Sequence, residues 1–350
     1  MREAFESRAR ERLRDVEPLP SPEALRRSVQ APARTAAIVQ QGRRALRDLL
    51  HGEDDRRLAV IIGPRSLHDP ALVLEYASRL RQLAQSLAGD LVILMRTHVE
   101  NPISGSDWRG LVHDPDGDGS GNVARGLRMA RVLLRDVNAL GVPCAAELVD
   151  PLVPGYLGDL MAWGGLGPGL VGSPVHVQLA SGMEFPVGFH EAENGALDAA
   201  CHALRDATRP KRFPGLAQDG QFAVLESSGN PDLHLVVDGA TCGSNFGASE
   251  VERAAAYAAE FGLARPLMLD CSRERTGEPP RTQAQVCRGA LQEVREGRRD
   301  IAGLMLESEL EERQRALQHR PLTEAGAACM GWNESADLIC EIAEAVKLAT

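Results

Sequence analysis

Lysine is almost absent from this sequence, which has only Lys211 and Lys347 among its 39 basic residues. Lys211 lies in the polar segment Arg-Pro-Lys-Arg, and Lys347 lies three residues before the C-terminus. An aldolase that forms a Schiff base needs a lysine amine where the substrate binds, at the end of a strand. Neither lysine has such a place, so a Schiff-base mechanism is excluded.

Other signals are missing as well. No apolar run approaches the 18 residues that a membrane span needs, and the charged N-terminal residues do not form a secretion signal. The seven cysteines are an odd number without a C-x-x-C pair, which is typical of reduced thiols. The net charge is −10 and no basic block is present, which disfavours nucleic acid and anionic membranes as partners. We therefore expect a cytoplasmic protein that binds neither.

The spacing of the apolar residues along the chain changes near residue 58. Residues 22–51 follow a loosely helical pattern and predict an N-terminal helical extension over residues 1–55. From Leu58 onward, short apolar runs alternate with longer amphipathic segments, which is typical of repeated strand–helix units. The runs predict eight strands, at 58–62, 91–96, 143–147, about 165–170, 185–189, 233–238, 266–270 and 301–306.

Seven amphipathic segments between and after these strands predict helices. Nearly continuous apolar strands are expected in a parallel sheet that is buried on both faces. Eight such units favour a (β/α)₈ TIM barrel over residues 56–350, with a β-hairpin inserted at about 213–227. The predicted helices are 70–87, 122–139, 154–163, 193–206, 248–261, 281–297 and 333–347.

Many short strings then occur in a fixed order along the chain. Together they resemble the class I DAHP synthase family, which consists of (β/α)₈ barrels that condense phosphoenolpyruvate with erythrose 4-phosphate in aromatic amino acid biosynthesis and use a divalent metal. The strings are GPRSLHDP (63–70), MR (95–96), ENP (100–102), WRGL (108–111), DP (114–115), DLMAWG (159–164), VH (175–176), LASG (179–182), PVGF (186–189), SGN (228–230), ES (307–308) and GW (331–332).

The resemblance also identifies positions where the chain departs from the family. Of the four metal ligands that the family implies, only the glutamate before Ser308 is kept, as Glu307. The cysteine of G-P-C-S is Arg65, the histidine of D-x-S-H is Arg273, and the aspartate before C-x-G-W is Ala327. One carboxylate beside two guanidiniums does not hold a transition metal, so we predict no metal and no cofactor at this place. We expect Arg65 or Arg273 to pair with Glu307 instead.

The positions that hold the substrate in the family have changed too. The arginine of M-R is kept as Arg96, but the lysine of K-P-R-T is Asn101. The lysine that ends P-V-G-F-K is His190, and the arginine that ends the sixth strand is Asp238. Each lost cation removes a charge-assisted contact worth about 1.5–3 kcal/mol. These changes predict that ordinary synthase activity is lost.

Three functions follow, and the sequence leaves open whether the chain is an enzyme. We favour a metal-independent enzyme that acts on a different, non-phosphorylated small substrate. Its catalytic residues would be His190, as general acid or base, with Glu147 and Asp238. The first alternative is a non-catalytic paralogue that binds a ligand or regulates an active synthase. The second is a working DAHP synthase.

The predicted partners follow from these functions. We expect a small-molecule ligand, and association either with further copies of the chain, as a dimer or tetramer, or with an active synthase. The resemblance implies that the N-terminal extension (1–55) and the hairpin carry these oligomer or regulatory contacts. The predicted substrate-binding residues lie at or after the ends of the predicted strands, and they are Arg65, Arg96, Asn101, Arg273 and Glu307.

Overall fold

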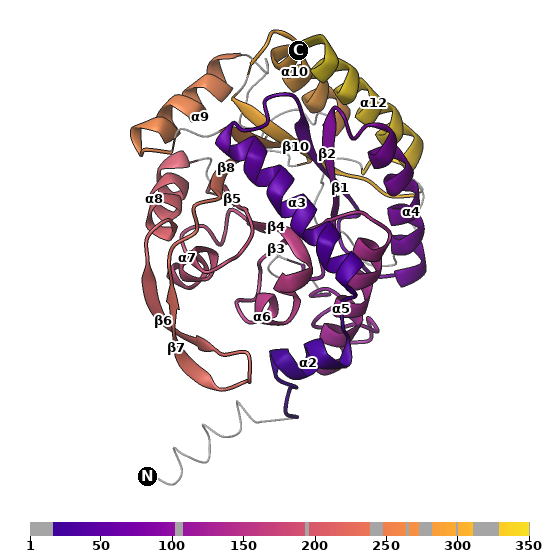
Figure 1. The fold of residues 1–350 in the computed structure, drawn as a ribbon, viewed down its shortest axis with the longest axis vertical. Helices are drawn as coiled ribbons and strands as arrows, with labels where there is room; N and C mark the ends of the chain where they lie inside the picture. The colour runs from indigo at the N-terminus through magenta and orange to yellow at the C-terminus, as the bar shows by residue number, and fades with distance from the viewer. Residues whose placement is uncertain are drawn as a thin grey trace.

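Eight parallel strands form a closed barrel (Figure 1), in the order β1-β10-β9-β8-β5-β4-β3-β2. The computed structural model describes residues 17–101, 108–192, 196–238, 248–263, 266–272, 282–298, 300–310 and 329–349. The predicted (β/α)₈ TIM barrel is confirmed. Its strands are β1 (Leu58–Gly63), β2 (Leu91–Arg96), β3 (Cys144–Glu147), β4 (Met161–Leu166), β5 (Val187–His190), β8 (Leu233–Asp238), β9 (Leu267–Asp270) and β10 (Ile301–Glu307).

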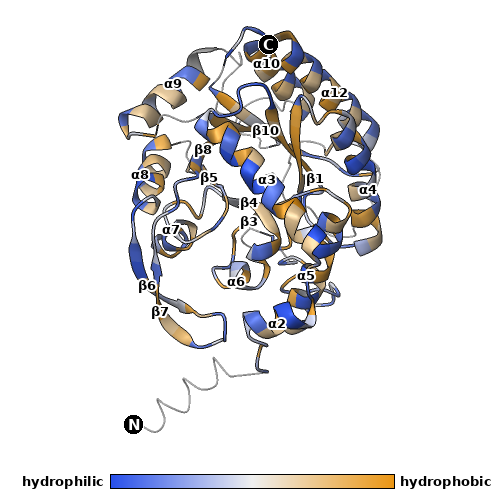
Figure 2. Cartoon of the chain, viewed as in Figure 1, coloured by the Kyte–Doolittle hydropathy of each residue, from blue (hydrophilic) through white to orange (hydrophobic). Residues whose placement is uncertain are grey.

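The helices surround the barrel and turn their polar faces outward (Figure 2). This arrangement follows from the sequence, because an amphipathic helix buries its apolar stripe against the strands. The helices are α2 (Pro22–Ser28), α3 (Ala33–His51), α4 (Pro70–Ser86), α5 (Val123–Ala139), α6 (Val153–Leu157), the 3₁₀ turn η1 (Gly158–Leu160), α7 (Pro174–Ser181), α8 (Leu197–Ala207), α9 (Ala248–Glu260), α10 (Gln283–Arg295) and α12 (Trp332–Ala349). No helix among the described residues is long and apolar enough to cross a membrane.

The interior of the barrel is filled by side chains. Trp163 of β4 is fully buried there, and its indole Nε1 donates to Nε2 of His234 at 3.1 Å. Gly188 of β5 makes room for the indole, because a Cβ atom at this position would lie 2.7 Å from Trp163. The barrel is therefore a packed core, and only its rims can hold a ligand.

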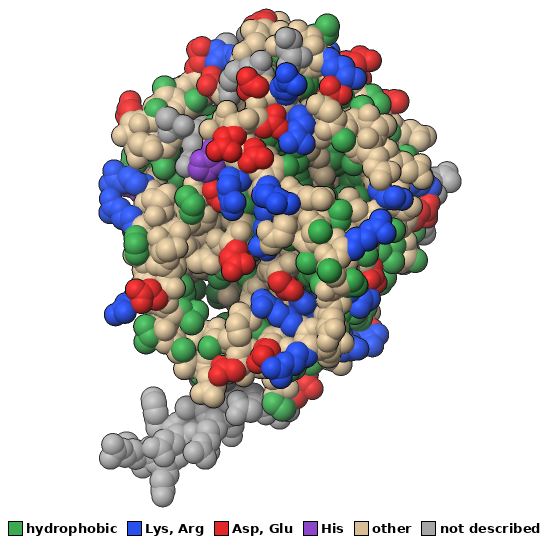
Figure 3. Space-filling model, in the orientation of Figure 1, with side chains coloured by type: hydrophobic (Ala, Val, Ile, Leu, Met, Phe, Trp, Pro, Cys, Tyr) green, Lys and Arg blue, Asp and Glu red, His purple; other side chains and the backbone are tan. Residues whose placement is uncertain are grey.

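Helix α3 closes the end of the barrel where the strands begin (Figure 1). Leu46 and Leu49 of α3 belong to the same buried cluster as Ile61 and Trp163 of the barrel. Arg43, which is also buried, donates to the backbone oxygens of Met161 and Gly158. On this face basic and acidic side chains are interspersed (Figure 3). The open rim is thus the opposite one, where the strands end.

Two predicted elements near residue 160 are wrong. The helix expected over 154–163 ends at Leu157, and the strand expected at about 165–170 is β4, which begins at Met161. The run from Met161 is buried because it pairs with both β3 and β5, whereas Gly155 and Gly158 weaken the helix before it. The error came from reading the glycine-rich segment after Leu166 as part of the strand.

Other boundaries also differ from the sequence prediction. The helical segment 22–51 is two helices, because Pro32 precedes α3 and disfavours helical backbone in the residue before it. Helix α7 was not predicted, although Ser173-Pro174 is a common way for a helix to begin. The hairpin consists of β6 (Lys211–Leu216) and β7 (Phe222–Ser227), so it begins two residues before the predicted range.

Candidate active site

Six of the eight barrel strands end on an ionisable residue. In a parallel barrel these residues gather around one rim, where substrates bind in enzymes of this architecture. The six are Arg96 (β2), Glu147 (β3), His190 (β5), Asp238 (β8), Asp270 (β9) and Glu307 (β10). The sequence predicted five of them as site residues and missed Asp270. The signal for Asp270 was its position directly after an apolar run.

Two arginines share the carboxylate of Glu307. Nη1 of Arg96 lies 2.5 Å from Oε1, and Nε of Arg65 lies 3.0 Å from Oε2. The predicted pairing of Arg65 with Glu307 is therefore present, and Arg96 is a second partner that was not predicted. Gln283 at the start of α10 fixes the end of β10, because its side chain bonds both the backbone N and the backbone O of Glu307.

The pKa values of this cluster keep it charged. Burial would raise the pKa of Glu307, but the two guanidiniums outweigh burial and lower it below its ordinary value. Burial would lower the pKa of Arg96, but the carboxylates of Glu307, Asp270 and Glu147 outweigh burial and raise it. Glu307 and Arg96 therefore both stay ionised at neutral pH.

A second cluster lies at three neighbouring strands, β5, β8 and β9. Nδ1 of His190 lies 3.2 Å from Oδ1 of Asp238, and Asp238 stands opposite Asp270 in the sheet register. The backbone N and the hydroxyl of Ser272 donate to Oδ1 of Asp270 at 2.9 and 2.6 Å. One ligand atom from each of His190, Asp238 and Asp270 lies within 4.8 Å of the other two.

The other predicted site residues have different places. Glu147 is buried at the end of β3, close enough to Arg96 to influence its pKa. The side-chain amide of Asn101 donates to the backbone O of Trp108 at 3.1 Å, so Asn101 shapes the loop after β2. Arg273 lies outside the described residues, and so does Ala327.

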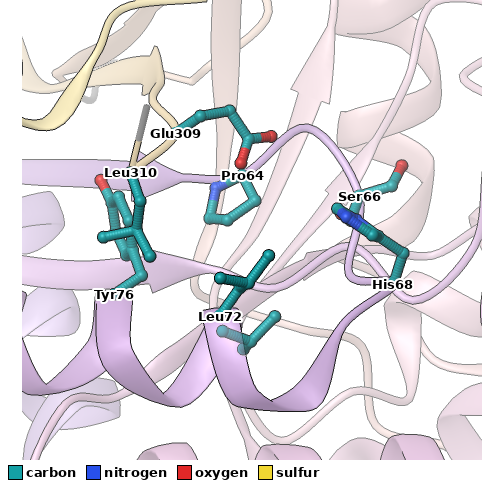
Figure 4. Close-up of a pocket in the computed structure, with 8 residues that line it drawn as sticks. Pro64, Ser66, His68, Leu72, Tyr76, Glu309 and Leu310 are labelled. Carbon is teal, nitrogen blue, oxygen red and sulfur yellow. The ribbon is translucent and has the colours of Figure 1, made fainter. Parts of the chain in front are cut away.

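A small cavity lies beside this rim, between α4 and the segment after β10 (Figure 4). Its walls include His68, Leu72, Tyr76 and Glu309. Its volume is about 10 Å³, which is at most the room for one water molecule. A substrate of several carbon atoms does not fit, so the strand ends are the better candidate.

Comparisons with known proteins agree with the fold and show the family. The family model described as the DAHP synthetase I family matches residues 30–348. The chain belongs to this family. The Tyr-sensitive phospho-2-dehydro-3-deoxyheptonate aldolase of Escherichia coli is 36% identical over 333 residues, which cover 94% of this chain and 93% of the relative. The Phe-sensitive enzyme of the same organism is 36% identical and covers 96% and 97%. A solved structure of the aldolase from Francisella tularensis has a TM-score of 0.88 and 31% identity, and covers 97% and 99%.

These findings contradict the prediction of a different chemistry. Relatives that align over nearly the whole chain are named as aldolases, and this supports a working enzyme. It supports neither a metal-independent enzyme on a new substrate nor a non-catalytic paralogue. The prediction was wrong because it judged each substituted position separately and did not consider how the charged residues are arranged together. The structure shows that the remaining and the exchanged charged residues still gather at one rim.

The metal position that the family implies does not fit a metal in this chain. Both oxygens of Glu307 are engaged by guanidiniums, and Arg65 stands where the family has a cysteine thiolate. A guanidinium keeps its positive charge and repels a cation. Among the described residues, nothing at this position could replace the lost ligands.

Proposed function

We propose that this protein catalyses the reaction in the names of its relatives, the formation of a 2-dehydro-3-deoxyheptonate phosphate from phosphoenolpyruvate and erythrose 4-phosphate. The family membership over residues 30–348 supports this proposal. The observation that carries it is the pair of guanidiniums on one buried carboxylate at the rim. Both substrates are anions, and arginine forks are suited to carboxylates and phosphates.

Arg65 has the donors that a substrate anion needs. Its Nε is used by Glu307, and its terminal nitrogens make no hydrogen bond within the described part of the chain. Its side chain is 30% exposed, so it is accessible from the rim. Glu307 holds the guanidinium in one orientation, which lowers the entropy lost when an anion binds. Arg65 is therefore a substrate-binding residue in this proposal.

Arg96 supports the same site from β2. Its guanidinium bonds Glu307 and lies 3.3–3.4 Å from Nδ1 of the buried His98. It is 12% exposed, which places its charge in a partly water-excluded environment where electrostatic attraction is stronger than in bulk water. Arg96 thus supplies fixed positive charge close to a substrate that Arg65 contacts.

The test is a direct assay of the purified full-length protein with both substrates and Mn²⁺. Release of inorganic phosphate and formation of the seven-carbon product are followed by mass spectrometry. We expect turnover, and a KM for phosphoenolpyruvate that rises about 10- to 150-fold in Arg65→Met, since a charge-assisted contact is worth about 1.5–3 kcal/mol.

The matched control is Arg288→Met. Arg288 lies on the outer helix α10 and pairs with Glu341, so it also bonds a carboxylate but lies away from the rim. Its variant should have the wild-type KM. Wild-type protein without turnover would refute the proposed function, and an unchanged KM in Arg65→Met would refute the role of Arg65.

A further inference from the structure

The carboxylate of Glu307 is the one ligand of the family's metal that this chain keeps, and two guanidiniums occupy it. Nη1 of Arg96 lies 2.5 Å from Oε1, and Nε of Arg65 lies 3.0 Å from Oε2. Each carboxylate oxygen therefore has a cationic partner within the protein. A metal ion could bind Glu307 only after at least one of these guanidiniums had moved away.

The surrounding contacts keep this carboxylate in place. The side-chain amide of Gln283 donates to the backbone O of Glu307 at 3.2 Å, and its Oε1 accepts from the backbone N at 2.7 Å. The backbone N of Ser308 donates to the backbone O of Gly63 at 2.9 Å, which ties the end of β10 to β1. The side chain of Glu307 is only 7% exposed. A fixed and buried carboxylate of this kind orients the groups that bond it.

Arg65 reaches the carboxylate from the loop after β1. Strand β1 pairs with β10 so that Gly63 lies opposite Glu307, and Arg65 follows two positions later. The resemblance implies a metal-binding thiolate at the position of Arg65. The chain thus replaces a group that attracts a cation by a group that is itself a permanent cation.

The two guanidiniums differ in what they leave free for a substrate. Arg96 bonds Glu307 with Nη1, and its Nε and Nη2 lie 3.4 and 3.3 Å from Nδ1 of His98, so it is held on two sides. Arg65 uses only Nε among the described residues, and its side chain is more exposed than that of Arg96. Its two terminal nitrogens carry four N–H donors. Arg65 is therefore a cation with free donors that is accessible from the rim.

The proposed reaction places negative charge on one substrate oxygen. The alkene pair of phosphoenolpyruvate forms a bond from C3 to the aldehyde carbon of erythrose 4-phosphate, and the C=O pair moves onto the aldehyde oxygen. Water adds to C2, one of its protons neutralises the alkoxide, and inorganic phosphate leaves with the other as the ketone forms. No oxidant or reductant takes part. A fixed cation with N–H donors stabilises such a developing oxyanion.

We propose that the guanidinium of Arg65 supplies the positive charge that a divalent metal supplies in the family, so that the reaction needs no metal ion. This inference rests on the proposed function. A guanidinium keeps its proton, so Arg65 donates hydrogen bonds to the aldehyde oxygen and does not act as an acid. Its second terminal nitrogen remains available for the anion of phosphoenolpyruvate. Glu307 then orients the cation, where the family implies a metal ligand.

The experiment compares one preparation of full-length protein with and without metal. The protein is treated with EDTA and dialysed, elemental analysis verifies that metal has been removed, and turnover of both substrates is measured in EDTA and in Mn²⁺. We expect kcat in EDTA to lie within about twofold of kcat in Mn²⁺, because no step uses the Lewis acidity of an ion. Any Mn²⁺ that stays bound through gel filtration should be the same in wild type and in Glu307→Gln.

Variants of Arg65 test the residue itself, with all rates measured in EDTA. Arg65→Met should lower kcat by about 100- to 1,000-fold, which is the usual effect of removing one donor to a developing oxyanion. Arg65→Lys keeps the charge without the planar fork and should lose less. The control Arg288→Met, on the outer helix α10, should keep the wild-type kcat. Circular dichroism verifies that each variant is folded.

Each result bears on a different part of the proposal. Turnover in Mn²⁺ that disappears in EDTA would overturn this inference and leave the proposed function intact, and so would one equivalent of Mn²⁺ that Glu307→Gln loses. Turnover in neither buffer would refute the proposed function and this inference with it. A wild-type kcat for Arg65→Met in EDTA would overturn the role of Arg65. The comparison of EDTA with Mn²⁺ uses wild-type protein, so the test stays valid if a variant does not fold.

Discussion

The ion-pair cluster at Glu307 offers a quantitative test of how the rim is stabilised. The perturbation is Arg96→Met, which removes one guanidinium and keeps a long apolar side chain. Arg96 and Glu307 are 12% and 7% exposed, so the pair is largely shielded from water. Removal of one partner from a buried pair costs about 3–5 kcal/mol, because the other charge stays buried.

The expected loss of unfolding free energy lies at the lower end of this range, because the second guanidinium on Glu307 outweighs the effect of the loss on the other carboxylates. Arg65 still pairs with Glu307 in the variant and compensates part of its charge. Asp270 and Glu147, which also attract Arg96, lose a nearby cation. We therefore expect the free energy of unfolding to fall by about 3 kcal/mol, a large part of the roughly 5–15 kcal/mol that stabilises a typical domain.

The assay is urea unfolding followed by circular dichroism in a buffer that contains a chelator. Arg288→Met is the control, because its partner pair is exposed and should contribute about 1 kcal/mol or less. The double variant with Glu307→Gln should show a coupling energy of about 1 kcal/mol or more. The reasoning is refuted if Arg96→Met is no more destabilising than Arg288→Met, or if the coupling energy is zero.

Three further predictions concern the acid sensitivity of the Glu307 cluster, the cysteines and the hairpin. The pKa of Glu307 is lowered in the folded state, so its stabilising contribution is full above the ordinary value of 4.5 and is lost as the pH falls through the lowered value. The stability difference between wild type and Glu307→Gln, measured by urea unfolding, should therefore shrink under acid conditions. Burial raises the pKa of Cys144 to about 12 and that of Cys201 to about 11, whereas Cys340 is exposed. Among the cysteines that the structure describes, iodoacetamide at neutral pH should modify Cys340 first, and peptide mapping that finds Cys144 modified equally fast in folded protein would contradict this. Phe222 and Val224 of β7 are 89% and 75% exposed, and exposed apolar side chains that lie together on one strand face are the kind of surface that a partner covers. Light scattering should show an oligomer that Phe222→Asp weakens, and identical masses for both proteins would argue against this surface.

Much of the fold could be predicted because its signals are local. An apolar run followed by an amphipathic segment identifies a strand and a helix without knowledge of the rest of the chain. The strands that begin at Leu58 and Leu91 are present at the predicted positions. The errors near Met161 occurred where glycines blur the pattern, and pairing with two neighbouring strands decided the boundary.

The site was predicted less completely. Individual residues such as Arg65 and Glu307 were identified from the resemblance, and their pairing was expected from charge alone. Asp270 was missed because the D-x-S-H motif was examined only at its last position, where Arg273 replaces the histidine. Gln283 gave no signal, since its contacts with the backbone of Glu307 exist only after α10 packs against β10.

The sequence by itself determined the eight-stranded barrel, the absence of a lysine for Schiff-base chemistry and the exchange of charged groups at the strand ends. Only the tertiary structure decided which of these groups meet. Arg65 and Glu307 are 242 positions apart in the chain, and they touch because β1 pairs with β10 when the barrel closes. For the same reason the strand ends at His190, Asp238 and Asp270 lie next to one another. Local periodicity sets the strands, whereas closure of the sheet sets which strand ends are neighbours.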